Sequence, residues 1–300
     1  MSEHDYRTES GSNCLLRYIP FADYLEIPAL SSSVIKNYGK SMKHGRLCET
    51  GVIGLGSGKP KPKYVEVGSI VDDWLMEMRP IEESLAYYPG KMRKGPAWRQ
   101  FVAENPGKVC ALESWRDDIE KAIAGCSQAV IENPEAAGII SNARRQVSGL
   151  IVPRGTKTQC KFRLDMVTAG EGCFDVSDLK TTADATAGIC GKVAANLGYK
   201  IQLANYATWY SMLSGLKIRD VRIIWLDMTD FDCVIDPVFR SGNSDHDDLV
   251  DQYARSIDII QRREKCLETN VWPGMGNRKV ISTPMWSVGD EESDEVKGLE

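Results

Sequence analysis

The sequence predicts an α/β fold in which a mixed central β-sheet is flanked by helices. Two observations support this class. Apolar residues recur with helical period in several segments before residue 143 and again near the C-terminus. Between residues 144 and 182, the apolar residues instead alternate with the period of two that is typical of strands. Helices, three strands, a long helix, another strand and a final helix together indicate a layered α/β arrangement.

Length and composition are those of a globular protein. The 300 residues are 42% hydrophobic and 26% charged, enough to bury one large core. We expect one domain over residues 21–285, with a helical N-terminal part (21–143) and a core that carries the chemistry (144–285). Polar residues 1–20 are expected to be flexible. The acidic tail, residues 286–300, is expected to be disordered and solvated.

The remaining composition excludes several classes of protein. The nine cysteines are scattered, odd in number and without a CxxC pair, which argues against a disulfide framework, a zinc site or an iron–sulfur cluster. No apolar run approaches the roughly 18–20 residues that span a bilayer. We therefore expect a cytoplasmic protein with no membrane partner. The net charge of −5 does not indicate a nucleic-acid binder, although basic clusters permit a phosphate-binding surface.

The N-terminal part reads as a series of helices. A serine among Ser31, Ser32 and Ser33 is a plausible N-cap for a short helix that follows it. In the next helix the apolar residues Ile70, Val71, Trp74, Leu75 and Met78 form one stripe. The helical segments expected here are Val67–Met78, Lys91–Asn105, Glu113–Ile131 and Glu135–Asn142.

The core begins where the period changes. Gln146–Val152 is expected to be a strand, and Lys161–Met166 and Phe174–Lys180 form two more, joined by a short glycine-containing connection that allows a hairpin. After a loop with Gly188 and Gly191, a long helix is expected over residues 192–213, ending at Gly215. The last elements are the buried strand Val221–Met228 and the amphipathic helix Leu249–Leu267.

Charged side chains converge in the predicted hairpin. Alternation places Phe162, Leu164 and Met166 on one face of the first strand, and Lys161, Arg163 and Asp165 on the other. In the second strand, Asp178 and Lys180 share a face with Phe174 and Val176, while Asp175 faces the opposite way. Two carboxylates and an ammonium can therefore meet at one point.

That trio has the composition of a hydrolytic Mg²⁺ site. Mg²⁺ prefers one or two carboxylates together with waters and phosphate oxygens, which Asp165 and Asp178 could supply with the backbone carbonyl of Leu179. Lys180 could position the attacking water or stabilise charge on a phosphate. The spacing alone is common, and by itself it more often marks an ordinary surface ion pair.

A second motif makes the pattern more specific. Asp165 and Asp178-Leu179-Lys180, followed by Gln202-Leu203-Ala204-Asn205-Tyr206, resemble the motifs of the PD-(D/E)xK nuclease superfamily in its RecB-like branch. The pattern is most similar to the RecE-type (exonuclease VIII) phage exonucleases. The stretch from Tyr24 to Ser31, the segment before Asp72 and the closing Trp272-Pro273-Gly274 extend the resemblance over roughly residues 20–275.

The resemblance implies a fold, an activity and partners. It implies a restriction-endonuclease-like core and a metal-dependent DNA exonuclease that digests linear double-stranded DNA from 5′ to 3′ in phage-type recombination. Mg²⁺ would be the cofactor, with Mn²⁺ as a possible substitute. The partners implied are DNA, further copies of the chain in a closed ring, and a single-strand annealing recombination protein.

It also implies roles for individual residues. Asp165, Asp178 and Lys180 would be catalytic, and Asp72, Asp165, Asp178 and the Leu179 carbonyl would hold the metal. Asp72 departs from the family, which usually has a histidine there, and Gln146 stands where a glutamate is expected. The residues expected to contact the substrate are Gln202, Tyr206, Arg163 and Thr181.

Two other functions remain open at this point. The same chemistry could serve a structure-selective or single-strand nuclease. Alternatively, the chain could be a non-catalytic nucleic-acid-binding subunit that retains the fold, which Asp72 in place of histidine and the acidic net charge favour.

Overall fold

The structure is a computed structural model that describes residues 13–16, 19–53, 63–77, 81–240 and 245–275. Most of the expected flexible N-terminus and all of the expected acidic tail lie outside these residues. Within them, no helix is long and apolar enough to cross a bilayer. All nine cysteines are free thiols.

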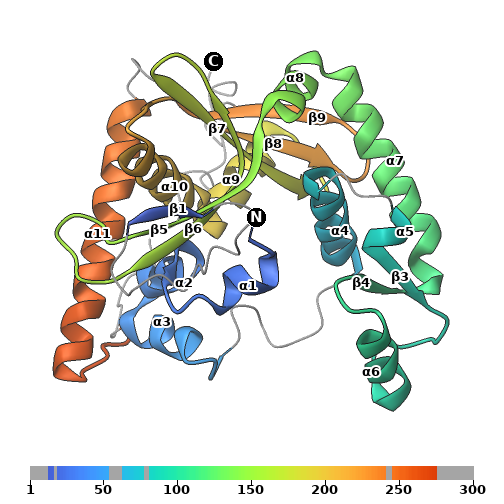
Figure 1. The fold of residues 1–300 in the computed structure, drawn as a ribbon, viewed down its shortest axis with the longest axis horizontal. Coiled ribbons are helices and arrows are strands. Elements are labelled where there is room, and N and C mark those ends of the chain that lie inside the picture. Colours follow the sequence, from blue (N-terminus) through green and yellow to red (C-terminus); the bar gives the residue numbers. More distant parts are fainter. Residues whose placement is uncertain (1–12, 17–18, 54–62, 78–80, 241–244, 276–300) are drawn as a thin grey trace, which may run out of the picture.

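A seven-stranded mixed sheet forms the centre of the fold (Figure 1). Its order is β1-β5-β6-β7-β8-β9, and the short β2 pairs with β6 beside this path. Only β2–β6 and β7–β8 are parallel among these pairs. The strands are β1 (Cys14–Leu16), β2 (Leu30–Ser31), β5 (Arg144–Ile151), β6 (Cys160–Ala169), β7 (Cys173–Thr182), β8 (Lys217–Asp227) and β9 (Cys233–Arg240).

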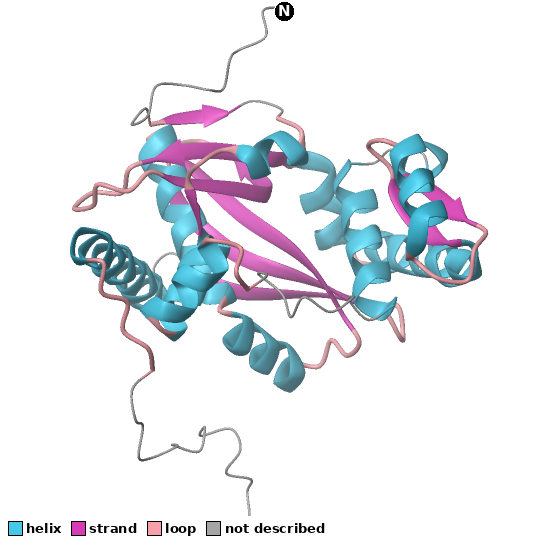
Figure 2. Cartoon of the chain, turned by 90° about the horizontal axis from the view of Figure 1, so that it is seen from below, coloured by secondary structure: helices cyan, strands magenta, loops and turns pink. Residues whose placement is uncertain are grey.

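Helices cover both faces of this sheet, as Figure 2 shows. One core contains Trp209, Trp225 and Phe162, all fully buried, and packs against α2, α10 and α11. The helices grouped near this side are α1 (Phe21–Glu26), α2 (Ser32–Lys40), α3 (Met42–Glu49), α9 (Ala187–Leu197), α10 (Tyr199–Ser214) and α11 (Asp245–Thr269). The predicted class, an α/β fold with a mixed sheet flanked by helices, is confirmed.

The opposite face carries a second core around Val71, Ile119 and Ile224. It is closed by α4 (Lys63–Glu77), α7 (Arg116–Glu132) and α8 (Pro134–Asn142). A parallel two-stranded sheet, β3 and β4, extends this side of the molecule (Figure 1). The elements of that extension are α5 (Ile81–Ser84), β3 (Leu85–Tyr88), α6 (Gly95–Glu104), β4 (Val109–Leu112) and the 3-10 helix Glu113–Trp115.

Three sequence-based predictions about the helices are wrong. The expected helix over residues 192–213 is two helices, α9 and α10, separated by Gly198 in the left-handed conformation (φ 64°). Glycine adopts this conformation without steric cost and commonly ends a helix. Gly188 and Gly191, expected in a loop, lie inside α9. The helix expected from Lys91 begins only at Gly95.

Five of the strands that the structure describes were not predicted: β1, β2, β3, β4 and β9. The first four are short, with two to four residues each. β9 contains Pro237, which lacks the amide hydrogen that an interior strand needs. Because β9 is the last strand of the sheet and pairs with β8 alone, its other edge needs no partner.

The predicted hairpin is present, but one part of its side-chain pattern is wrong. β6 and β7 pair antiparallel, and Phe174 and Val176 share a core as expected. Phe162 and Leu164 belong to that same core, whereas Met166 belongs to the core on the opposite face. β6 therefore changes the face on which it buries apolar side chains between Leu164 and Met166. Gln146 of the neighbouring strand β5 lies opposite this point, and its positive φ (54°) interrupts the regular pleat there.

The close approach of α4 to β7 yields a stability prediction. A Cβ added at Gly68 of α4 would lie 2.4 Å from Oγ1 and 3.2 Å from Cβ of Thr181. Gly68→Ala should therefore lower the free energy of unfolding by about 1–3 kcal/mol. Gly188→Ala in α9 is the matched control, because its Cβ would meet nothing within 4 Å. It should be neutral or stabilising by about 0.5–1 kcal/mol. Urea unfolding of both variants measures the difference, and equal effects would contradict the packing argument.

Candidate active site

Two strands bring Asp165 and Asp178 together. The ladder pairs Met166 with Ser177, so Asp165 and Asp178 are the next residues across the hairpin. Oδ2 of Asp165 accepts a hydrogen bond of 3.1 Å from the backbone amide of Leu179. The Asp178 side chain is almost completely buried, at 3% exposed, and that of Asp165 is 19% exposed.

Lys180 lies at the centre of these oxygen atoms. Its Nζ is 2.6 Å from Oδ2 of Asp178 and 3.7 Å from Oδ2 of Asp165. It also donates a hydrogen bond of 2.8 Å to the Leu179 carbonyl. Oδ2 of Asp178 is buried and forms this ion pair with Lys180. The two carboxylates and the carbonyl expected to hold a metal therefore surround one ammonium group.

Asp72 approaches the same group from the other side, on α4. Its Oδ1 is buried and has no hydrogen-bond partner. Asp72 lines one cavity together with Asp165, Asp178 and Lys180. A buried carboxylate oxygen without a donor is costly, so this atom is poised to accept a proton or a positively charged ligand.

The electrostatics follow from three carboxylates near one ammonium. Burial raises the pKa of Asp72 to about 7, with Asp178 adding to the shift and Lys180 opposing it. Burial and the charge of Asp178 hold the pKa of Asp165 well above its usual range. Burial alone would lower the pKa of Lys180, but the attraction of Asp178, Asp165 and Asp72 outweighs it and holds that pKa well above its usual range.

The motif residues of α10 lie at this cavity. Gln202 lines it, and its Oε1 accepts a hydrogen bond of 2.8 Å from Nζ of Lys36 on α2. Tyr206 also lines the cavity, with its ring 6.3 Å from that of Phe162, and burial holds its pKa well above the usual range. Burial lowers the pKa of Lys36 to about 8 against the attraction of Asp178. Lys36 was not predicted from the sequence.

The other two expected substrate contacts are placed differently. Arg163 lines the cavity, donates through Nε to Gln146 and through Nη1 to the Ile19 carbonyl at 2.9 Å. Thr181 does not line it, because its side chain lies against Gly68 of α4. The alternation that turns Lys180 toward Asp178 turns Thr181 to the opposite face.

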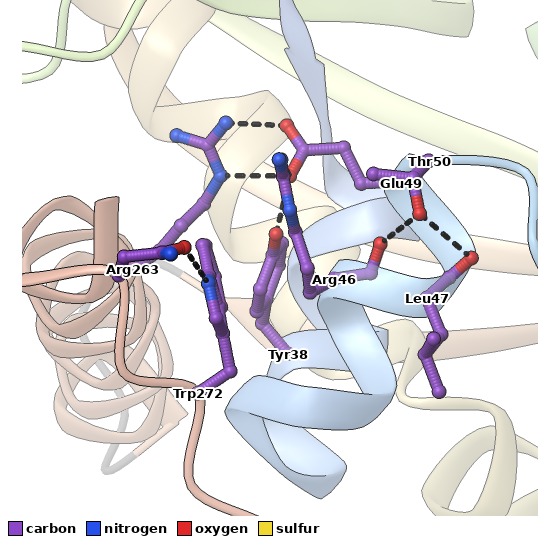
Figure 3. Close-up of polar contacts among 8 residues, drawn as sticks. Tyr38, Arg46, Leu47, Glu49, Thr50, Arg263 and Trp272 are labelled. Atoms are coloured by element: carbon purple, nitrogen blue, oxygen red, sulfur yellow. Dashed lines mark hydrogen bonds and ion pairs between the residues drawn. The ribbon is translucent and has the colours of Figure 1, made fainter.

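A half-open cavity of about 870 Å³ connects these residues. Its wall also includes Asp73 of α4, Glu49 of α3 and Arg263 of α11, charged residues that sequence reasoning did not single out. Figure 3 shows the contacts of Glu49 and Arg263. Arg263 donates through Nε to Glu49 at 3.3 Å and through Nη2 to the second carboxylate oxygen. No motif marked them, since each is an ordinary charge on an amphipathic helix.

Figure 3 also shows what anchors Glu49. The Tyr38 hydroxyl donates to the same carboxylate, and the ring of Trp272 lies 6.2 Å from that of Tyr38. Burial raises the pKa of Glu49, but hydrogen bonds from Arg263 and Tyr38 outweigh it and leave the pKa below its usual range. Glu49 therefore stays ionised and ties α3 to α11 along one wall of the cavity.

The described residues contain no group of three or more His, Cys, Asp or Glu side chains arranged to hold a metal ion by themselves. The convergent oxygens include a backbone carbonyl, and Lys180 lies between the carboxylates. Any metal at this place would have to take part of its coordination from water or substrate.

Comparisons with known proteins give no family. No protein-family model and no curated protein matches the chain. The crystal structure of SSO0001 is 15% identical over 64% of this chain and 85% of that chain, with a TM-score of 0.26. Protein VC1899 from Vibrio cholerae is 14% identical over 84% of this chain and 61% of its own length, with a TM-score of 0.22. At these TM-scores neither likeness supports a shared fold or function.

The raised pKa of Asp72 predicts how stability depends on pH without divalent metal. The folded state holds this proton up to about pH 7, whereas the unfolded state releases it near pH 3.8. The stabilisation is therefore present at low pH and is lost as the pH rises toward 7. Asparagine cannot ionise, so Asp72→Asn avoids the cost of burying a carboxylate. The variant should raise the free energy of unfolding of the metal-free protein at pH 8 by about 1–4 kcal/mol.

Thermal melting at pH 5 and pH 8 in a chelator measures the effect. The gain should be smaller at pH 5, where Asp72 is protonated in the folded state and only the lower part of the interval between pH 3.8 and 7 has been crossed. Asp251→Asn is the control, because Asp251 is exposed on α11 and does not line the cavity, so it should show no comparable rise between the two pH values. An equal gain at both pH values would contradict the assignment.

Proposed function

We propose that the chain is a Mg²⁺-dependent deoxyribonuclease with a restriction-endonuclease-like core, similar to RecE-type exonucleases. The observation that carries this proposal is the convergence of the Asp165 and Asp178 carboxylates and the Leu179 carbonyl on Lys180 Nζ, in a cavity shared with the two α10 motif residues. Its substrate would be linear duplex DNA, digested from 5′ to 3′, in the cytoplasm.

The residues present fit such a metal. Their donors are hard oxygens, which suit Mg²⁺ and Mn²⁺. The Oδ1 atom of Asp72 is buried without a partner, as expected of an atom that binds a cation. The two strand carboxylates and the Leu179 carbonyl would hold the ion, and the remaining positions would be left to water and phosphate, as Mg²⁺ prefers. A bound Mg²⁺ would polarise the phosphate and lower the pKa of the attacking water.

The chain's own groups divide the remaining work. Asp165 and Asp178 fix the position of Lys180, whose ammonium can donate to the attacking water or to a phosphate oxygen. Gln202 and Tyr206 line the wall where the phosphate backbone would pass. Arg163 remains a candidate phosphate contact at this wall, whereas the position of Thr181 leaves it no part in the proposal.

The resemblance also leads us to propose partners. They are further copies of the chain in a ring around DNA, and a single-strand annealing recombination protein that receives the exposed strand. Both proposals rest on the motif resemblance alone.

The activity can be tested with three variants. Asp178→Ala and Lys180→Ala should each lower the rate of cleavage of linear duplex DNA in Mg²⁺ at least about 100-fold, because each removes a charge from the reacting centre. Asp175→Asn is the matched control. Asp175 is a buried carboxylate of the same strand, paired with Arg219 and Arg222 away from the cavity. Its rate per folded molecule should match wild type, and equal rates in all four proteins would end the proposal.

The direction of digestion separates the proposal from a structure-selective or single-strand nuclease. The wild type should degrade linear duplex but not the closed circle of the same sequence. Duplexes labelled at the 5′ end should lose their label as mononucleotides first, while 3′ label should persist. Cleavage of the circle, or a preference for single strands, would favour the alternative.

Metal binding distinguishes an enzyme from a non-catalytic DNA-binding subunit. Millimolar Mg²⁺ or Mn²⁺ should raise the Tm of the wild type, because the ion binds the folded state. Asp165→Asn should abolish that rise. Calorimetric titration and melting curves give the measurement, with the distant Asp175→Asn as the control that keeps the rise. A rise that survives Asp165→Asn would contradict the metal site.

A further inference from the structure

Two apolar side chains are exposed on the wall of the cavity. Phe21 is 57% exposed and Leu25 is 58% exposed, and both line the space that contains the carboxylates. They are four residues apart in α1, so they lie on one face of that helix. Tyr24, between them, is 5% exposed and stacks beside Phe21 with ring centroids 6.2 Å apart. Part of α1 is thus anchored in the fold while its apolar face stays open.

Strand β6 fixes the position of this helix. Lys161 is buried, and its Nζ donates three hydrogen bonds of 2.9 Å to the carbonyls of Tyr24, Leu25 and Ile27. Those bonds use all three donors of an ammonium. Arg163 adds the bond to the Ile19 carbonyl. Asp165 belongs to the same strand, so α1 is held at a set position relative to the candidate reacting centre.

A positive charge accompanies the aromatic side chain. The Arg163 guanidinium lies 5.6 Å from the centroid of the Phe21 ring and 5.8 Å from that of Tyr24. Proteins that bind single-stranded nucleic acid combine aromatic faces for the bases with cations for the backbone. Both chemistries are present at this point of the cavity wall.

The size of the cavity limits what can enter it. A volume of about 870 Å³ is that of an ordinary small-ligand pocket, roughly 300–1,000 Å³. A space of that size is too small for both strands of a duplex. A few nucleotides of one strand can fit, and a base that enters this way has left its pairing partner.

We propose that the Phe21–Leu25 face of α1 is a stacking platform for an unpaired base of the strand whose phosphate reaches Asp165 and Asp178. The inference rests on the proposed nuclease function and deepens it, since it makes the bound substrate an unpaired nucleotide even when the DNA is duplex. Lys161 is a positioning residue that holds the platform, and Phe21 supplies the aromatic surface.

The test compares Phe21→Ala with Phe21→Trp. The probe is a short single-stranded DNA, intact or with one abasic site moved along its terminal nucleotides, bound in Ca²⁺ so that cleavage does not interfere. Phe21→Ala should weaken binding of the intact strand about 5- to 150-fold, the range for one base–aromatic contact. Phe21→Trp should restore it. With the abasic site at the stacked position, wild type and Phe21→Ala should bind equally.

The controls separate stacking from folding. Phe21 and Leu25 are exposed, so Phe21→Ala and Leu25→Ala should melt like the wild type. Ile131→Ala removes an equally exposed apolar side chain (67%) on α7, outside the cavity, and should bind like the wild type. Lys161→Met should weaken binding of the intact strand and leave binding of the matched abasic strand unchanged.

The outcomes are distinguishable from those of the nuclease test. The platform is overturned if Phe21→Ala weakens binding of intact and abasic strands equally, or does not weaken binding at all. Either result leaves the proposed function standing if the wild type cleaves DNA. A wild type that neither cleaves nor binds DNA overturns both the platform and the proposed function.

Discussion

The candidate site depends on one ammonium group that neutralises a surplus of buried carboxylates. Asp72, Asp165 and Asp178 face Lys180, so these four side chains carry three negative charges and one positive charge when all are ionised. Burying carboxylates away from water raises the free energy of the folded state unless a counter-charge is close. The distances of 2.6 and 3.7 Å from Lys180 Nζ supply part of that compensation. The rest appears as a raised affinity of Asp72 and Asp165 for protons. A net charge of −2 is also the charge that a divalent cation would neutralise.

This arrangement requires that α4 and the hairpin stay in contact. The absence of a side chain at Gly68 lets α4 approach Thr181 of β7, and one turn further along α4 the chain places Asp72 at the cavity. β6 has a similar double role on the other side. It contributes Asp165 and, through Lys161 and Arg163, holds α1 and the residues around it. The positions of the charged side chains therefore depend on how α4 and α1 pack against the hairpin. Moving one of these helices would also move the site residues that it carries or contacts.

Much of the fold could be predicted because it depends on local pattern. The strands of the hairpin follow from alternation, and most helices from an apolar stripe and a terminal glycine or proline. The errors have identifiable causes. Gly198 ends one helix inside an apolar pattern that continues into the next. Pro237 makes the edge strand β9 unlike a strand in sequence. The irregular backbone at Gln146 accompanies the burial of Met166 on the other face of the sheet. Each depends on backbone geometry or on the position of a strand within the sheet.

The sequence by itself determined that Asp178 and Lys180 lie on one side of β7, since they are two residues apart in a strand. Asp165 meets them because the β6–β7 ladder places it opposite Asp178, where Gln146 interrupts the regular pleat. The motif resemblance added Asp72, Gln202 and Tyr206 as candidates. Only the tertiary structure decided that Glu49 and Arg263 border the same space, that Lys36 donates to Gln202 beside it, and that Thr181 does not line it. Those residues come from helices distant in sequence, and no local pattern encodes which helices meet. The packing of both layers against the sheet determines it.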